Sequence, residues 1–198
     1  MKLTNLLILL CTAFSLYAWN TSNNLAFSEY ALFHGGYYTL LTGLFVHASL
    51  VHLAGNMLFL YVFGSSLENE VGARRTAAVF FTGGILSFVL SIPFYPGADM
   101  LGASAAIFAV MAAVLLVRRP GYSIQFLSPL GPLALLYFIF NIASVGSGGN
   151  VAYISHVIGF LIGLFFGAWW NTEWKKSLLL TLLLAGYIML YNYLKVWI

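Results

Sequence analysis

Charged residues are scarce in this sequence. Of its 198 residues only 7% are charged, whereas 62% are hydrophobic. Soluble domains carry about 25% charged residues, so these few charges could not cover a soluble surface of this size. Composition therefore excludes an ordinary soluble domain and predicts an all-α, polytopic membrane protein.

Cysteine and basic clusters are also nearly absent. The single cysteine, Cys11, excludes an intrachain disulfide, and we interpret it as a packing residue of the first apolar run. Leu9 and Leu10 precede it where a lipoprotein cleavage site needs small residues. The net charge of +3 comes from scattered basic pairs that form no stripe, so no nucleic-acid partner is predicted.

Long hydrophobic runs, by contrast, dominate the chain. A membrane-spanning helix needs about 20 mostly apolar residues. The second and fourth runs are shorter, as expected for helices that begin below the membrane surface at a cavity. A signal peptide is the alternative reading of the first run, although the topology works better if that segment is retained. We predict seven membrane helices, at 3–19, 52–67, 76–94, 102–117, 127–144, 151–170 and 177–197.

The basic residues orient these helices. The positive-inside rule makes the side that carries most Lys and Arg cytoplasmic. We therefore predict a cell-membrane protein with its N-terminus in the cytoplasm and its C-terminus outside. Only Lys195 falls on the outer side, and the cytoplasmic side holds Lys2, Arg74, Arg75, Arg118, Arg119, Lys175 and Lys176.

The predicted outer loop 20–51 is long for a simple connection. It holds one charged residue, Glu29, and is rich in aromatic and small residues. It is too polar and too interrupted by glycine for a clean span. An interfacial or re-entrant segment in the outer leaflet is the better interpretation.

Ser104 is a polar residue at the start of an apolar, alanine-rich run. It follows the turn-like stretch "PGADMLGA", so it is expected near a helix N-terminus, where free N–H groups can stabilise an oxyanion. Gly102 would leave room for a substrate backbone. The alternative is a serine that only caps the helix.

His156 is the second polar residue in an apolar run, and its predicted depth matches that of Ser104. Gly159, Gly163 and Gly167 follow it on the same helical face. Small residues at this spacing let two membrane helices approach closely, as a Ser–His hydrogen bond requires. The alternative is a histidine bonded to a backbone carbonyl. The fourth run offers small residues as a counterpart: Ala105, Ala109, Ala112 and Ala113.

His52 and Asn56 are four residues apart and so share one helical face. An amide and a neutral imidazole can each donate a hydrogen bond to a developing oxyanion. The alternative is a polar clasp between helices.

Metal ligands and intramembrane carboxylates are missing from the pattern. His34 and His47 lie in the outer loop, but neither an HExxH motif nor a carboxylate accompanies them, so no metal site and no cofactor are predicted. The acidic residues all read as loop or interfacial positions. A hydrolase would therefore use a Ser–His dyad. Its histidine would be oriented by packing, with Phe108 as the packing partner. The five acidic residues are Glu29, Glu68, Glu70, Asp99 and Glu173.

Three motifs together resemble the rhomboid family of intramembrane serine proteases. "HLAGNM", "GASAAIF" and "SHVIGFLIG" are similar, in that order, to its HxxxN, GxSx and HxxGxxxG elements, and "FGSSLENEVG" to the end of its second core helix. The resemblance covers residues 1–170 and implies a six-helix catalytic core there. Segment 177–198 would be an additional C-terminal membrane helix.

The resemblance implies roles for the polar residues. Ser104 would be the nucleophile and His156 the general base. Asn56 and His52 would form the oxyanion hole with the Ser104 N–H. Substrates would be transmembrane segments of other membrane proteins, cut near the outer face of the bilayer. Gly102, Phe108 and Gly159 would support the site, and Glu68 and Gly72 would be structural.

Some positions depart from the family pattern. Ala105 stands where many members have glycine, Phe108 where tyrosine is frequent, and Tyr38–Thr39 where a Trp–Arg pair is frequent. None of these departures removes a catalytic group, and an inactive member is the alternative.

Other functions remain open at this point. A helix-binding scaffold or a small transporter could use the same polar residues, although no buried carboxylate or inverted repeat favours a transporter. A membrane metalloprotease is a third reading. For an enzyme, the glycine-rich loop "SVGSGGNVA" is the predicted lid over the site.

Overall fold

Helices make up the regular structure in the described part of the chain. The computed structural model describes residues 1–21, 23–117, 137, 139–141, 152–179, 181–183 and 186. Within these residues the only β pairing is an isolated bridge between Phe27 and Met100. The all-helical prediction is confirmed for this part. The predicted spans 127–144 and 177–197 and the lid "SVGSGGNVA" lie largely outside it, so the count of seven helices and the domain division stay predictions.

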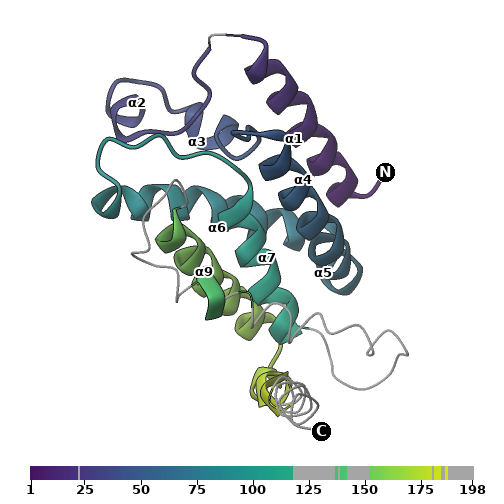
Figure 1. Ribbon diagram of the computed structural model, residues 1–198. Coiled ribbons are helices and arrows are strands. Elements are labelled where there is room, and N and C mark those ends of the chain that lie inside the picture. Colours follow the sequence, from purple (N-terminus) through teal and green to yellow (C-terminus); the bar gives the residue numbers. More distant parts are fainter. Residues whose placement is uncertain are drawn as a thin grey trace, which may run out of the picture.

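Three described helices are long and apolar enough to cross a bilayer: Leu50–Val71, Ala73–Phe94 and Tyr153–Trp170. Two shorter apolar helices accompany them, α1 (Leu3–Trp19) and α7 (Ser104–Val117). These five segments correspond to five of the predicted spans and form the bundle in Figure 1.

The second helix is longer than the sequence suggested. It runs from α4 (Leu50–Phe59) through a π-helical turn at Leu60–Gly64 into α5 (Ser65–Val71), so a helix is confirmed at the predicted span 52–67 but the expectation that it is short is wrong. Glu68, in the polar last part of this helix, caps α1. Its carboxylate accepts hydrogen bonds from the N–H groups of Leu3 and Thr4, at 2.8 and 2.9 Å. A carboxylate at a helix N-terminus is favourable.

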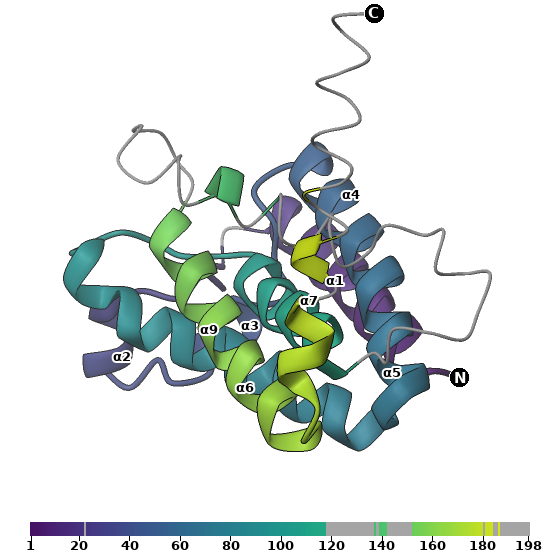
Figure 2. The ribbon, with the colours of Figure 1, turned by 90° about the horizontal axis from the view of Figure 1, so that it is seen from below.

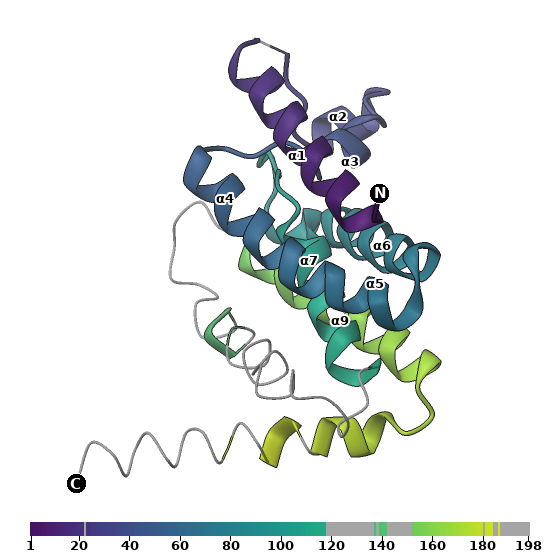
Figure 3. The ribbon, with the colours of Figure 1, turned by 90° about the vertical axis from the view of Figure 1, so that its right-hand side faces the viewer.

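Helix α7 is the centre of the bundle. Every residue from Ala105 to Leu116 is buried, because α5, α6 (Ala73–Ser91) and α9 (Tyr153–Trp170) all pack against it (Figures 1 and 3). A helix that is apolar on all sides belongs in such a position. Its 14 residues extend only about 21 Å, less than the roughly 30 Å hydrocarbon core. Ser104 therefore begins a helix too short to span the membrane alone.

Glycines bring α9 against α7. A Cβ atom at Gly159 would collide with the carbonyl of Ala105, and one at Gly163 with the carbonyl of Ala109. One turn later, a Cβ at Gly167 would lie 2.8 Å from the Cβ of Leu116. The predicted small-residue face is therefore the contact between these helices.

The predicted outer loop folds over the end of the bundle where α7 begins. It contains α2 (Glu29–Phe33) and α3 (Thr39–Thr42), which lie together at the upper left of Figure 1, with α2 at the left of Figure 2. Met100 exchanges two backbone hydrogen bonds with Phe27, and the Gly102 N–H donates to the Gly43 carbonyl at 2.8 Å. The outer loop thus fixes the segment that leads into Ser104.

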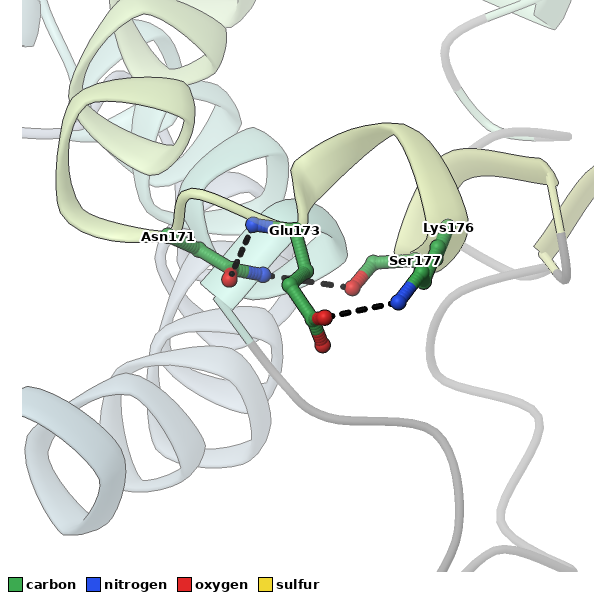
Figure 4. A network of polar contacts seen from close by, with 4 residues as sticks. All are labelled: Asn171, Glu173, Lys176 and Ser177. Atoms are coloured by element: carbon green, nitrogen blue, oxygen red, sulfur yellow. Dashed lines mark hydrogen bonds and ion pairs between the residues drawn. The ribbon is translucent and has the colours of Figure 1, made fainter.

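The opposite ends of α7 and α9 are joined through Asn171 (Figure 4). The Asn171 side chain accepts from the Glu173 N–H and donates to the Ser177 hydroxyl. The same amide donates to the Leu116 carbonyl at 2.6 Å, one of the carbonyls left unpaired at a helix C-terminus. Lys176 pairs with Glu173 at the surface.

Candidate active site

Ser104 and His156 are hydrogen-bonded to each other. Ser104 is the first residue of α7 and is partly exposed, and His156 lies in the first turn of α9 and is buried. The distance from His156 Nε2 to Ser104 Oγ is 2.7 Å. This is within the range required of a nucleophile and its base.

A residue that the sequence argument missed completes the contacts of the imidazole. Asn141 Oδ1 lies 2.7 Å from His156 Nδ1. The prediction that packing alone orients His156 is therefore incomplete. The signal was available, because Asn141 is a polar residue inside the predicted apolar span 127–144, the same criterion that selected Ser104.

Aromatic rings cover the face of the imidazole. Phe108 stacks on His156 with ring centroids 4.7 Å apart, as the spacing predicted. Tyr137 also stacks on Phe108 at 5.1 Å, and Phe59 stacks on Tyr137 at 4.9 Å. Residues from α4, α7 and α9 thus meet Tyr137 in one stack.

The backbone and surroundings of Gly102 suit only glycine. Its φ of +109° suits glycine, and a Cβ there would lie 2.9 Å from His52 Cε1. The His52 ring therefore occupies the Cβ side of Gly102, and the approach of a substrate backbone to Gly102 stays a prediction. His52 Nδ1 accepts a 3.4 Å hydrogen bond from the Ala48 N–H, which leaves Nε2 to carry the proton of the neutral ring.

Asn56 lies on the same helix as His52 and is nearly buried. Its amide Nδ2 donates to the His52 carbonyl at 2.9 Å. An amide nitrogen carries two N–H groups, so a second donor remains on this side chain. The N–H groups of Ser104, Ala105 and Ala106 lack the acceptors that helix residues find one turn back.

His47 supports the loop that precedes the serine. Its Nδ1 atom lies 3.1 Å from Ser15 Oγ, and its Nε2 atom lies 3.4 Å from the Ala103 N–H. Burial, together with the nearby His52, lowers the pKa of His47 to about 4. His47 is therefore neutral at physiological pH and able to accept at Nε2.

His34, the other loop histidine, lies apart from this cluster. It is exposed, stacks on Tyr30 and bonds the Tyr30 carbonyl. In the described ranges no three His, Cys, Asp or Glu side chains gather in a way that could hold a metal ion.

Comparison with known proteins agrees with this arrangement. A family model described as the rhomboid domain matches residues 34–171, more than half of the chain. The chain belongs to the rhomboid family. The resemblance seen in the motifs is confirmed, and the protein is a membrane protein of this family.

Individual rhomboid relatives differ in what their names say. Rhomboid protease GluP of Bacillus subtilis is 34% identical over 136 residues, 68% of this chain and 26% of that protein. RHOMBOID-like protein 6, mitochondrial, of Arabidopsis thaliana is 32% identical over 131 residues, 65% of this chain and 42% of the relative. Inactive rhomboid protein 1 of Drosophila melanogaster is 35% identical over 78 residues, 39% of this chain and 6% of its own length.

The chain therefore spans less than half the length of these rhomboid relatives. The family includes members named as proteases and a member named inactive.

Proposed function

We propose that this chain is an intramembrane serine endopeptidase that cleaves transmembrane segments of other membrane proteins. The observation that carries the proposal is the 2.7 Å contact between Ser104 Oγ and His156 Nε2. A nucleophile within hydrogen-bond reach of an oriented base is the arrangement that covalent acyl transfer requires.

The reaction follows from these two side chains. Ser104 Oγ bonds to the scissile carbonyl carbon while its proton passes to His156 Nε2, and the carbonyl π electrons move to the oxygen. The oxyanion collapses, the C–N bond breaks, and the imidazolium returns the proton to the leaving amine. Water then repeats the sequence on the acyl-enzyme.

The oxyanion is assigned to three donors. They are the Ser104 N–H at the start of α7, the second N–H of Asn56 and the Nε2–H of His52. The first lies at the positive end of a helix, and the other two come from one face of α4. Each donor is worth about 2.7–4 kcal/mol in the transition state where such a group has been removed from a protease.

The site is assigned to the outer face of the cell membrane, because seven of the eight basic residues fall on the other side of the predicted topology. Helical substrates hide their carbonyls in their own hydrogen bonds. We therefore expect cleavage where a substrate helix unwinds near its outer end.

The experiment compares purified wild type with Ser104→Ala and His156→Ala on a generic transmembrane substrate in detergent. Both variants should lose cleavage, and Ser104→Ala should also lose labelling by a fluorophosphonate probe. Ser65→Ala and His34→Ala are matched controls away from the site. Cleavage by Ser104→Ala at the wild-type rate would sink the proposal, and an unlabelled, inactive wild type would instead indicate an inactive member of the family.

A further inference from the structure

The amide of Asn141 contacts the ring nitrogen of His156 that does not face Ser104. It belongs to the short described segment 139–141, is only 3% exposed, and bonds His156 Nδ1 at 2.7 Å. A buried polar side chain from a separate part of the chain thus contacts the candidate base directly.

A second hydrogen bond fixes which end of the amide faces the histidine. Asn141 Nδ2 donates to the carbonyl of Tyr153 at 3.0 Å. Only the nitrogen end can donate to a carbonyl, so the oxygen end must face His156. Tyr153 is the first residue of α9, one turn before His156. Both ends of the Asn141 amide are therefore hydrogen-bonded to α9.

The oriented amide in turn fixes the proton on the imidazole. Asn141 Oδ1 can only accept a hydrogen bond, so His156 Nδ1 must carry the N–H. A neutral imidazole carries one N–H, which leaves a lone pair on Nε2, the atom 2.7 Å from Ser104 Oγ. A general base for the serine hydroxyl needs this tautomer.

Stacking on Phe108 could not make this choice. A half-turn of the imidazole about its Cβ–Cγ bond keeps the ring in the same plane, and so keeps the contact with Phe108. That half-turn exchanges each nitrogen position with a carbon position, and only directional hydrogen bonds oppose it. Partners at both nitrogens are therefore needed to hold the reactive geometry.

We infer that Asn141 is a positioning residue for His156, in the place that a carboxylate occupies in a Ser–His–Asp triad. The inference rests on the proposed function of Ser104 and His156. When His156 accepts the serine proton, the Nδ1–H bond to Asn141 becomes charge-assisted and strengthens. Asn141 keeps its own protons throughout and adds no charge to the membrane interior.

Three variants of the full chain test this role in detergent. Asn141→Leu removes the acceptor at similar volume and should lower kcat roughly 10- to 100-fold, with KM within about twofold. Asn141→Asp keeps the acceptor oxygen and should recover kcat to within about tenfold of wild type. Asn69→Leu, which removes an exposed asparagine of α5 far from His156 along the chain, should leave kcat unchanged.

The tautomer gives a readout that does not depend on cleavage. Nitrogen-15 NMR of histidine-labelled protein should show His156 protonated at Nδ1 in wild type and in Asn141→Asp. The signal is assigned by its loss in His156→Ala. Asn141→Leu should give a mixture of tautomers, and if that variant does not fold, the Asn141→Asp spectrum decides.

Wild-type kcat in Asn141→Leu, or an unprotonated Nδ1 in wild type or Asn141→Asp, would overturn the inference. A failed proposed function has a different result. Wild type would then neither cleave substrate nor react with the fluorophosphonate, while the Asn141-dependent tautomer would persist.

Discussion

The Nε2 atom of His47 faces the backbone N–H of Ala103 at 3.4 Å, next to the candidate nucleophile. The contact joins the outer loop to the start of α7 and requires an unprotonated Nε2. His47 Nδ1 then carries the proton and donates a hydrogen bond to Ser15 Oγ. The Ser15 hydroxyl in turn donates to the Phe45 carbonyl at 3.2 Å. A buried chain of neutral groups thus holds the residue before Ser104.

Acid should destabilise the fold through His47. Its pKa falls from 6.5 to about 4 on folding, so between these values the unfolded chain binds the proton and the folded chain does not. Stability should therefore decrease as pH falls from about 6.5 to 4. Thermal unfolding in detergent across this pH range measures the decrease in stability. The decrease should be smaller in His47→Gln than in wild type, and in His34→Gln it should equal that of wild type. An equal decrease in His47→Gln would contradict this assignment.

Replacement of Gly102 by alanine should reduce activity more than stability alone explains. Its positive φ and the His52 ring both oppose a Cβ. Gly97 is the matched control, since its φ of +71° is also positive but nothing lies within 4 Å. Both variants should lose roughly 1–2 kcal/mol of stability, and only Gly102→Ala should lose more than about tenfold in kcat/KM. Equal activity in the two variants would argue against a role for the His52 contact.

A methyl group at Gly163 should push α9 away from α7. The Cβ would overlap the Ala109 carbonyl, and overpacking of this kind costs about 1–3 kcal/mol. Cleavage should fall as well, because the same two helices carry Ser104 and His156. Gly55→Ala adds a methyl group to open space and serves as the control. Unfolding by denaturant measures the stability of both variants. If Gly163→Ala is as stable as Gly55→Ala, the close contact between α7 and α9 at Gly163 does not contribute to stability.

Loss of the Glu68 carboxylate should loosen α1. Glu68 accepts from two backbone N–H groups and from the Thr4 hydroxyl. Glu68→Ala should lower the free energy of unfolding by about 1–3 kcal/mol. The exposed Glu70, on the same helix, should tolerate alanine within about 0.5 kcal/mol. Similar unfolding midpoints for the two variants would contradict the assignment of Glu68 as the cap of α1.

Much of the site followed from residue type and period alone. Ser104 and His156 stood out because polar groups in hydrocarbon are costly. The glycine spacing after His156 predicted the helix contact that brings them together, because side chains four apart share a face. The all-helical class followed from composition together with the length of the apolar runs, and Phe108 from its spacing to Ser104.

Only the tertiary structure decided which groups complete the site. Asn141 is distant from His156 along the chain, and no local periodicity relates the two. The His52 ring lies against Gly102, because the outer loop ties Gly102 to Gly43 and brings it against α4. The sequence by itself determined which side chains are chemically unusual in a membrane. Their partners were decided by hydrogen-bond geometry between segments that meet only in the folded bundle.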